Sequence, residues 1–231
     1  MKPKQYTQGW VEFYKLKFKV TPDVLIPRPE TELLVDKVLT HARPGLARLT
    51  ILDVGTGAGN IAISIAKNLS RHPWGRKLKI IATDVSEKAL KIARQNAKLH
   101  GVENRIQFIQ SDLLSKIATL PWVARNDVEM DIIVTNLPYI PTERIPYLDS
   151  SVKDFEPHIA LNGGPDGFEL YRKLFQQINE LDWKPKLILG EIDYTHGELA
   201  LNEAYKYFPN AQIEIKTDLA HKQRILIISK A

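Results

Sequence analysis

Cysteine is absent from the 231 residues of the sequence. This absence excludes disulfide bonds, thiolate catalysis and thiolate metal sites, and it fits a reducing compartment such as the cytoplasm. Long apolar runs are lacking as well, since the first twenty residues hold no unbroken apolar stretch and no segment is long enough to cross a bilayer. We therefore expect a cytoplasmic protein with neither a signal peptide nor a membrane partner.

A strong excess of one charge is also missing, because 32 Lys and Arg residues face 27 Asp and Glu residues and the net charge is +5. Such a mild basic excess usually serves solubility, and weak contact with RNA or the ribosome is the alternative. The histidines are scattered without the spacing of metal ligands, so no metal site is expected. We expect a monomer. Part of the basic excess lies near the N-terminus, at Lys2, Lys4, Lys15, Lys17, Lys19 and Arg28.

Strand-like and helix-like segments alternate along most of the chain, which predicts an α/β fold with a parallel sheet and helices on both faces. An alternating segment at 11–20 predicts an N-terminal β-hairpin. We divide the chain into a hairpin with an extended segment, residues 1–28, and a main domain, residues 29–231. The expected strands are 49–54, 78–83, 105–110, 130–135, 187–192, 213–216 and 224–229, and the expected helices are 31–39, 60–69 and 86–100.

A glycine-rich loop follows the first core strand, and ligands of such sheets bind beyond the carboxyl ends of the strands. A phosphate-binding P-loop would need Gly-Lys-Ser/Thr, and a dinucleotide fingerprint would need G-x-G-x-x-G, whereas this loop has neither. Its backbone amides suit a carboxylate and its acid suits an ammonium group, as in the amino-acid end of S-adenosylmethionine. The alternative is a tight turn that needs glycine for packing. The predicted cofactor-binding loop comprises Asp53, Gly55, Thr56, Gly57, Ala58 and Gly59.

Two further acids follow predicted strands. Asp84 ends the second core strand, where it can accept hydrogen bonds from both ribose hydroxyls, because Ser86 is available to cap the next helix. Asp112 follows the third strand and could accept from an adenine amine while Leu113 packs on the ring. The alternative for Asp112 is a cap on a short helix at 113–118.

The tetrapeptide Asn136-Leu137-Pro138-Tyr139 follows the fourth core strand. The Asn136 side-chain oxygen and the Leu137 carbonyl oxygen can each accept one N–H of a planar NH₂ group, Pro138 stiffens the loop, and Tyr139 offers an aromatic face. A proline-rich turn is the alternative for an isolated match. Beside the glycine loop, the tetrapeptide predicts methyl transfer to a planar nitrogen, with all four residues at the catalytic and substrate site and Asn136 also near the cofactor.

The chain resembles the HemK/PrmC family of release factor glutamine methyltransferases along nearly all of its length. The segments IPRPETELLVD, ILDVGTGAGNIAISIA, NLPYIP and FEPHIALNGGPDGFELYRKL carry the likeness. The resemblance implies a class I S-adenosylmethionine-dependent methyltransferase fold, Rossmann-like, with a seven-stranded and mostly parallel sheet. It also implies that the substrate is the glutamine of a Gly-Gly-Gln loop in a peptide-chain release factor. Arg28 and Glu32, in the IPRPETE segment, are then expected at the substrate site.

Departures from the family keep rival functions open. The family usually has proline where Leu137 stands, and it usually carries a helical N-terminal domain that this chain is expected to lack. A ribosomal-protein glutamine or the exocyclic amine of adenine in nucleic acid would fit the same tetrapeptide. A non-catalytic module that binds cofactor or partner is the other rival. The irregular stretch 142–165 is expected to act as a substrate-binding lid.

Overall fold

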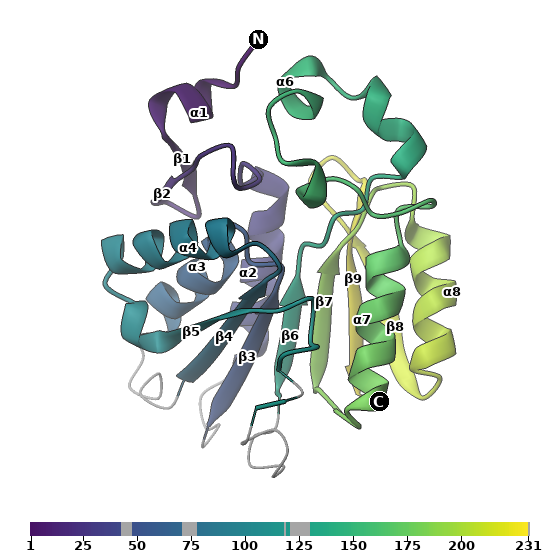
Figure 1. Ribbon diagram of the computed structural model, residues 1–231. Coiled ribbons are helices and arrows are strands. Elements are labelled where there is room, and N and C mark those ends of the chain that lie inside the picture. The colour runs from purple at the N-terminus through teal and green to yellow at the C-terminus, as the bar shows by residue number, and fades with distance from the viewer. Residues whose placement is uncertain (43–47, 71–77, 118, 121–129, 231) are drawn as a thin grey trace.

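A seven-stranded sheet forms the centre of the protein (Figure 1). The computed structural model describes residues 1–42, 48–70, 78–117, 119–120 and 130–230. The strand order is β5-β4-β3-β6-β7-β9-β8, with β9 antiparallel to both of its neighbours and the other pairs parallel. The predicted fold class is therefore confirmed. The strands are β3 (Leu49–Val54), β4 (Leu78–Asp84), β5 (Ile106–Gln110), β6 (Ile132–Thr135), β7 (Leu187–Glu191), β8 (Ala211–Thr217) and β9 (Gln223–Lys230).

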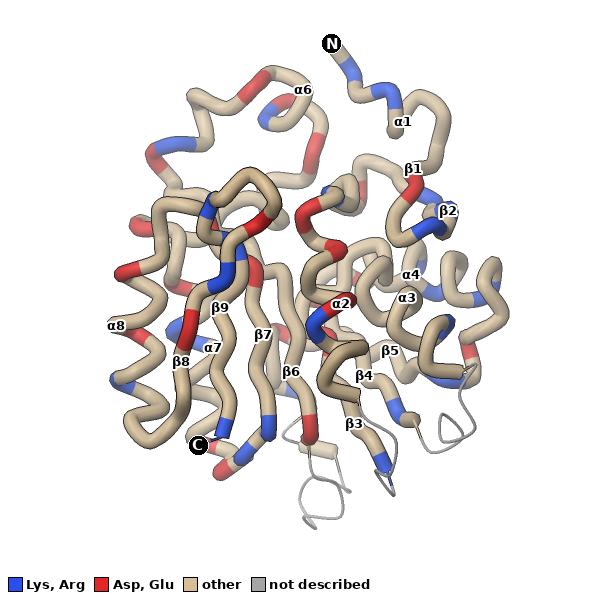
Figure 2. Tube along the Cα trace, turned by 180° about the vertical axis from the view of Figure 1, so that it is seen from behind, with Lys and Arg blue, Asp and Glu red and all other residues tan. Residues whose placement is uncertain are grey.

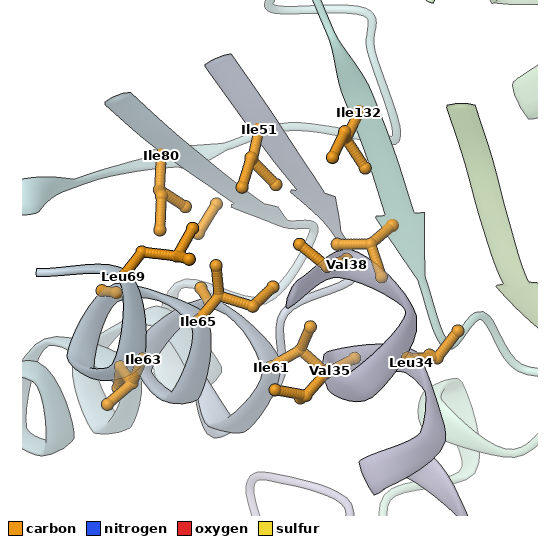
Figure 3. Close-up of a cluster of buried hydrophobic side chains, with 14 of the residues drawn as sticks. Leu34, Val35, Val38, Ile51, Ile61, Ile63, Ile65, Leu69, Ile80 and Ile132 are labelled. Carbon is orange, nitrogen blue, oxygen red and sulfur yellow. The ribbon is translucent and has the colours of Figure 1, made fainter. Parts of the chain in front are cut away.

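Two helical layers cover the two faces of this sheet, because successive side chains of a strand point to opposite faces. In β3, Ile51 packs into a buried cluster with helices α2 (Glu32–His41), α3 (Asn60–Leu69) and part of α4 (Glu87–Leu99), as Figure 3 shows for α2 and α3. The next residue, Leu52, packs into a second cluster with α7 (Glu169–Glu180) and α8 (Gly197–Tyr207). The strand β3 is buried on both faces and therefore has an almost unbroken apolar sequence.

Local sequence signals explain where helix α4 begins and ends. The Ser86 hydroxyl oxygen accepts a hydrogen bond from the Ala89 N–H at 3.2 Å, so Ser86 caps α4 as predicted. Gly101 follows the end of α4 with φ of +65°, a conformation that glycine adopts without strain. Helices α7 and α8 were not predicted, although the apolar residues of α7 have helical spacing. Its buried positions are Tyr171, Leu174, Phe175 and Ile178.

The N-terminal hairpin forms a separate two-stranded sheet of β1 (Trp10–Phe13) and β2 (Leu16–Lys19), preceded by α1 (Lys4–Gln8). Phe13 and Phe18 lie in the same buried cluster as α2 and α3. The Asn96 side chain of α4 accepts from the Lys19 N–H at 2.8 Å and donates to the Lys19 carbonyl oxygen at 3.1 Å. The hairpin thus shares its core with the sheet, and the division of the chain at residue 28 stays a prediction.

A long connection between β6 and α7 lies beyond the carboxyl ends of the parallel strands, near α1 and the hairpin (Figure 1). It is built from short helical turns rather than from regular strands or long helices. The lid hypothesis concerns this connection and stays a prediction. The turns are η4 (Thr142–Tyr147), α6 (Ser150–Lys153) and η5 (His158–Ala160).

The contribution of the hairpin to stability can be measured at Phe18, which is fully buried and contacts Phe13 edge-on at a ring distance of 6.0 Å. We expect Phe18→Ala to lower the free energy of unfolding by about 3–5 kcal/mol, because it leaves a cavity in the shared core. Urea unfolding followed by circular dichroism measures the change. The control Leu219→Ala, at a residue that is 97% exposed, should change stability by less than about 0.5 kcal/mol. Equal effects of the two substitutions would contradict a shared core.

Candidate active site

The register of the sheet brings the predicted motifs to one edge. Val54, the last residue of β3, pairs with Thr83 of β4 on one side and with Thr135 of β6 on the other. Thr135 in turn pairs with Gly190 of β7. The residues that follow these pairs therefore start side by side at the carboxyl ends of the strands: Gly55, Asp84, Asn136 and Glu191. The strand order reverses between β3 and β6, which is where open α/β sheets bind ligands.

Asp53 organises the glycine loop from beneath. Its Oδ2 accepts from the Thr56 hydroxyl at 2.7 Å and from the Ala62 N–H at 3.1 Å, in the first turn of α3. Its side chain is fully buried, and this burial raises the pKa of Asp53 to about 7. The Oδ1 atom has no hydrogen-bond partner within the described residues. It is an acceptor still available at the base of the loop.

The glycines let the loop pass close to neighbouring elements. Gly59 has φ of +82°, and a Cβ atom there would lie 2.8 Å from Ile63 Cδ1 and 3.1 Å from Ala93 Cβ. The Ala58 carbonyl oxygen accepts from Asn96 Nδ2 of α4 at 2.8 Å. Close packing of the loop against α4 thus favours glycine at 59, as in a tight turn that needs glycine for packing. Gly55 and Gly57 also have positive φ, of +73° and +55°.

A cavity of about 330 Å³ opens beside the loop at this edge. It collects six residues singled out from the sequence, and its other walls are mostly apolar. The predicted residues in its lining are Gly55, Asp84, Asp112, Leu113, Leu137 and Pro138. The residues that sequence reasoning missed are Val85, Ser111, Ile159, Ala160, Leu170 and Lys173. Four of these lie in the FEPHIALNGGPDGFELYRKL segment, which carries the family likeness but received no site residues from the sequence: Ile159, Ala160, Leu170 and Lys173.

Asp84 faces this cavity while its carboxylate also holds the loop. Oδ1 accepts from the Ser86 N–H and Oδ2 accepts from the Gly57 N–H, both at 2.9 Å. Burial raises the pKa of Asp84, and the backbone N–H donors oppose the shift. Each oxygen keeps further lone pairs, so the carboxylate can still accept from a ligand hydroxyl.

Asp112 forms an ion pair with Lys173 of α7, with Oδ2 and Nζ 2.5 Å apart. The side chain is about half exposed, so the pair contributes little to stability. Residues 113–117 form turns, and Ala118, the last residue of the predicted short helix, lies outside the described residues. Leu113 is buried with φ of +50°, which directs its side chain into the second core cluster next to the cavity.

The tetrapeptide is joined to β7 and to the segment before α2. Asn136 Nδ2 donates to the Thr31 hydroxyl oxygen at 3.1 Å, and the Tyr139 hydroxyl donates to Glu191 Oε1 at 3.1 Å. Thr31 donates to Glu191 Oε2 at 2.7 Å. Glu191 ends β7 as Asp84 ends β4, but the predicted strand 187–192 places Glu191 inside the strand, so the strand-end rule did not single it out.

The backbone of the tetrapeptide rests on the segment 161–167. The Ile140 N–H donates to the Leu161 carbonyl oxygen at 3.0 Å, and the Gly163 N–H donates to the Ile140 carbonyl oxygen at 2.9 Å. A Cβ atom at Gly163 would lie 2.7 Å from both the Pro138 carbonyl oxygen and Tyr139 Cα. The FEPHIALNGGPDG segment therefore supports the loop that carries Asn136.

Arg28 and Glu32, expected at the substrate site, make internal contacts instead of lining the cavity. Arg28 is ion-paired with the buried Glu156 of the connection after β6, and Glu156 Oε2 also accepts from the Ile26 N–H at 3.3 Å. Glu32 Oε1 accepts from the Tyr14 N–H at the hairpin turn, at 2.7 Å. The two residues hold the hairpin and the connection near the site, and their contact with substrate stays a prediction.

A second and larger cavity, of about 510 Å³, lies near the opposite edge of the sheet. Residues from the ends of α7, α8 and β9 line it, including Trp183, Tyr207, Phe208 and Ile228. None of the predicted site residues is among its lining. Size alone therefore does not identify the active site. We assign the smaller cavity as the candidate site because the polar residues at the strand ends converge there.

Neither a metal cluster nor a membrane helix is found in the part of the chain that the structure describes. No group of three or more His, Asp or Glu side chains there could hold a metal ion. Among the same residues, no helix is long and apolar enough to cross a membrane.

Comparisons with known proteins agree on one class. Residues 47–206 match a family model described as a methyltransferase domain. The chain is 38% identical to the release factor glutamine methyltransferase of Lactococcus lactis subsp. lactis, covering 98% of this chain and 77% of that protein. It is 43% identical to the protein of the same name from Moorella thermoacetica, covering 97% and 74%.

Solved structures share the fold at low sequence identity. A ribosomal protein L11 methylase from Lactobacillus delbrueckii subsp. bulgaricus aligns with a TM-score of 0.58 at 22% identity, over 91% of this chain and 83% of that chain. The N-terminal domain of human METTL16 in complex with SAH aligns with a TM-score of 0.63 at 14% identity, over 94% and 77%. These likenesses support the class I methyltransferase fold.

The buried acid of the glycine loop gives a test by pH. Asp53 has a pKa of about 7 in the folded protein and about 3.9 when unfolded, so its contribution to stability is full below about pH 4 and is lost as the pH rises through about 7. Because asparagine does not ionise, the stability of Asp53→Asn relative to wild type should rise by about 2–3 kcal/mol between about pH 5 and about pH 8. Urea unfolding at both pH values measures it. A difference that does not change with pH would show that Asp53 keeps an ordinary pKa.

Proposed function

The chain belongs to the family of release factor glutamine methyltransferases, and on that premise we infer that it methylates the side-chain amide of a glutamine in a peptide-chain release factor. S-Adenosylmethionine is the cofactor, in agreement with the methyltransferase domain. The observation that carries the assignment is the cavity in which the glycine loop and Asp84 meet Leu137 and Pro138. In this cavity the tetrapeptide, which is proposed to bind the acceptor amide, lies next to the glycine loop, which is proposed to bind the cofactor.

The cofactor fits the residues at this edge. We propose that Asp84 accepts from the ribose hydroxyls and that Asp112 and Leu113 receive the adenine. The loop Asp53 to Gly59, of which Gly55 lines the cavity, would hold the amino-acid end, with the buried and unpartnered Asp53 Oδ1 as an acceptor beneath the loop. When bound, the cofactor supplies a methyl group on a sulfonium, which is an electrophile that needs no metal or strong base for transfer.

The protein's task is to orient the acceptor nitrogen. A glutamine amide nitrogen is a poor nucleophile because its lone pair is delocalised into the carbonyl group. If Asn136 Oδ1 and the Leu137 carbonyl oxygen each accept one N–H, the nitrogen is fixed in direction and the positive charge that develops on it is stabilised. The new bond would join the nitrogen to the methyl carbon as the bond from that carbon to the sulfonium sulfur breaks and leaves a neutral thioether, and an amide proton would then leave to solvent. Tyr139 would pack against the amide, with its hydroxyl anchored on Glu191.

Leu137 can serve the same purpose as the proline usual at its position. The contact with substrate uses only the backbone carbonyl, which leucine also has. The Leu137 side chain is buried in the second core cluster together with Tyr171, and the Tyr171 hydroxyl donates to the Glu191 carbonyl oxygen. Leucine lacks the ring that fixes the backbone of proline, so here packing of the side chain restrains the loop.

Weak contact with RNA or the ribosome is a secondary proposal. Figure 2 shows Lys and Arg residues on the segment with β1 and β2 and on α4. The two elements are neighbours, because His100 Nε2 lies 2.9 Å from the Lys17 carbonyl oxygen. Part of the charge is neutralised, as Arg94 pairs with Glu87 and Lys88 with Asp23. We propose that this surface contributes only a weak, salt-sensitive attraction to RNA or the ribosome. We also propose that the protein is a monomer.

The assignment predicts which residue receives the label from methyl-labelled cofactor. We expect incorporation into a peptide-chain release factor and none into the variant whose Gly-Gly-Gln glutamine is replaced by alanine. Mass spectrometry of the digested product locates the methyl group. Equal labelling of both release factors would exclude this substrate site. Labelling of ribosomal protein or of nucleic acid in a cell extract, with none in release factor, would favour the rival acceptors, and cofactor binding without any product would favour a non-catalytic module.

Asn136 is expected to act in turnover and not in cofactor binding. We expect Asn136→Ala to lower kcat by at least about 10²-fold, because one preorganised acceptor for the developing charge is lost. Cofactor affinity, measured by calorimetry, should change by less than about threefold, since the cofactor contacts proposed here come from other residues. Unchanged turnover would remove Asn136 from the mechanism.

A further inference from the structure

Thr31 lies between the catalytic amide and a buried acid. It is 2% exposed and sits at the start of α2, at the end of the 3-10 turn η1 (Pro29–Thr31). A threonine in this place usually caps the helix with its hydroxyl, yet Thr31 makes no capping hydrogen bond. Its hydroxyl instead joins Asn136 Nδ2 at 3.1 Å to Glu191 Oε2 at 2.7 Å.

Chemistry fixes which group donates and which accepts in this series of hydrogen bonds from Asn136 through Thr31 to Glu191. An ionised carboxylate only accepts hydrogen bonds, whereas a hydroxyl has one hydrogen to donate. If Thr31 gives that hydrogen to Glu191, it can only accept from its other neighbour. The end of the Asn136 side chain at Thr31 must then be the NH₂ group, and the Oδ1 atom faces the other way.

Glu191 is placed to remain an acceptor. Its second oxygen accepts from the Tyr139 hydroxyl at 3.1 Å, so two hydroxyl donors converge on one carboxylate that is 1% exposed. Burial raises the pKa of Glu191, and the two hydroxyl groups and the charge of Arg224 oppose that rise, while Glu30 adds to it. The geometry, with one hydroxyl group within hydrogen-bond distance of each carboxyl oxygen, fits a Glu191 side chain that accepts from both neighbours.

We propose that Thr31 is a positioning residue which, backed by Glu191, holds the Asn136 amide with its oxygen toward the acceptor nitrogen. The inference rests on the proposed function for its meaning in catalysis. Without this restraint the amide can turn by 180°, since its two ends have nearly the same shape. The turned amide presents an NH₂ group to the NH₂ group of the substrate, and the acceptor for one substrate N–H is lost.

The kinetic test compares two substitutions at one site. Thr31→Val keeps the shape but removes the hydroxyl, and we expect kcat to fall about tenfold or more while KM for the release factor changes less than about threefold. Thr31→Ser restores the hydroxyl and should retain at least about a third of kcat. The matched control is Thr40→Val, because the Thr40 hydroxyl donates to the Asp36 carbonyl oxygen on the exposed side of α2. Equal losses in the Val and Ser variants, or none in Thr31→Val, would overturn the proposal.

A second readout does not depend on turnover. In ¹⁵N nuclear magnetic resonance of the protein without substrate, the Asn136 side-chain NH₂ signals are identified by their loss in Asn136→Ala. We expect slow hydrogen exchange of one Nδ2 hydrogen in wild type and Thr31→Ser, and fast exchange in Thr31→Val. Fast exchange in wild type would refute the orientation. Slow exchange together with no methylation of any release factor would refute the proposed function and leave the orientation intact.

Discussion

The register of β3 between β4 and β6 is the constraint on which the site depends. Because Val54 pairs with both Thr83 and Thr135, the loops that leave the three strands begin at the same height. A shift of one residue would turn every side chain of β3 to the other face and would separate Gly55 from the cavity. The two buried clusters prevent such a shift, since they require Ile51 on one face and Leu52 on the other. The geometry of the edge is thus set by core packing, well away from the edge itself.

Buried carboxylates then connect segments that are distant in sequence. Asp53 joins the glycine loop to α3, and Glu156 joins the connection after β6 to the segment before α2. Glu191, at the end of β7, joins that segment to the tetrapeptide loop after β6. Each acid loses hydration on burial, and each accepts hydrogen bonds from two donors. If one donor moved away, the buried acid would be left partly unsatisfied, which costs free energy. Each loop is therefore held firmly in the position in which its donors reach the acid. The glycine loop and the tetrapeptide are therefore preorganised before any ligand arrives.

Much of this arrangement could be predicted from the sequence, because strand ends in a parallel sheet share one edge. The bounds of β3 and α3 were predicted correctly, and the strand-end rule placed Asp84, Leu113 and Leu137 around one cavity. The contact of Thr31 with Glu191 could not be predicted, since it spans 160 residues and depends on how η1 packs against β7. For the same reason the ion pair of Arg28 with Glu156 could not be predicted, and the substrate role that the family resemblance implies for Arg28 stays a prediction. Pattern and spacing identify elements and their ends, but they do not say which side chains meet across loops.

The contact between the two site loops has an evolutionary consequence. A Cβ atom at Gly55 would lie 3.3 Å from Leu137 Cδ2, so the side chain at 137 occupies the space beside the cofactor loop. The residues at these two positions cannot vary independently, because the room available at one depends on the size of the other. Across related sequences the pair should show covariation, and a substitution tolerated at 137 in one homologue should prove harmful in another. The identity of residue 137 is thereby a matter of epistasis with the glycine loop as well as of chemistry at the acceptor amide.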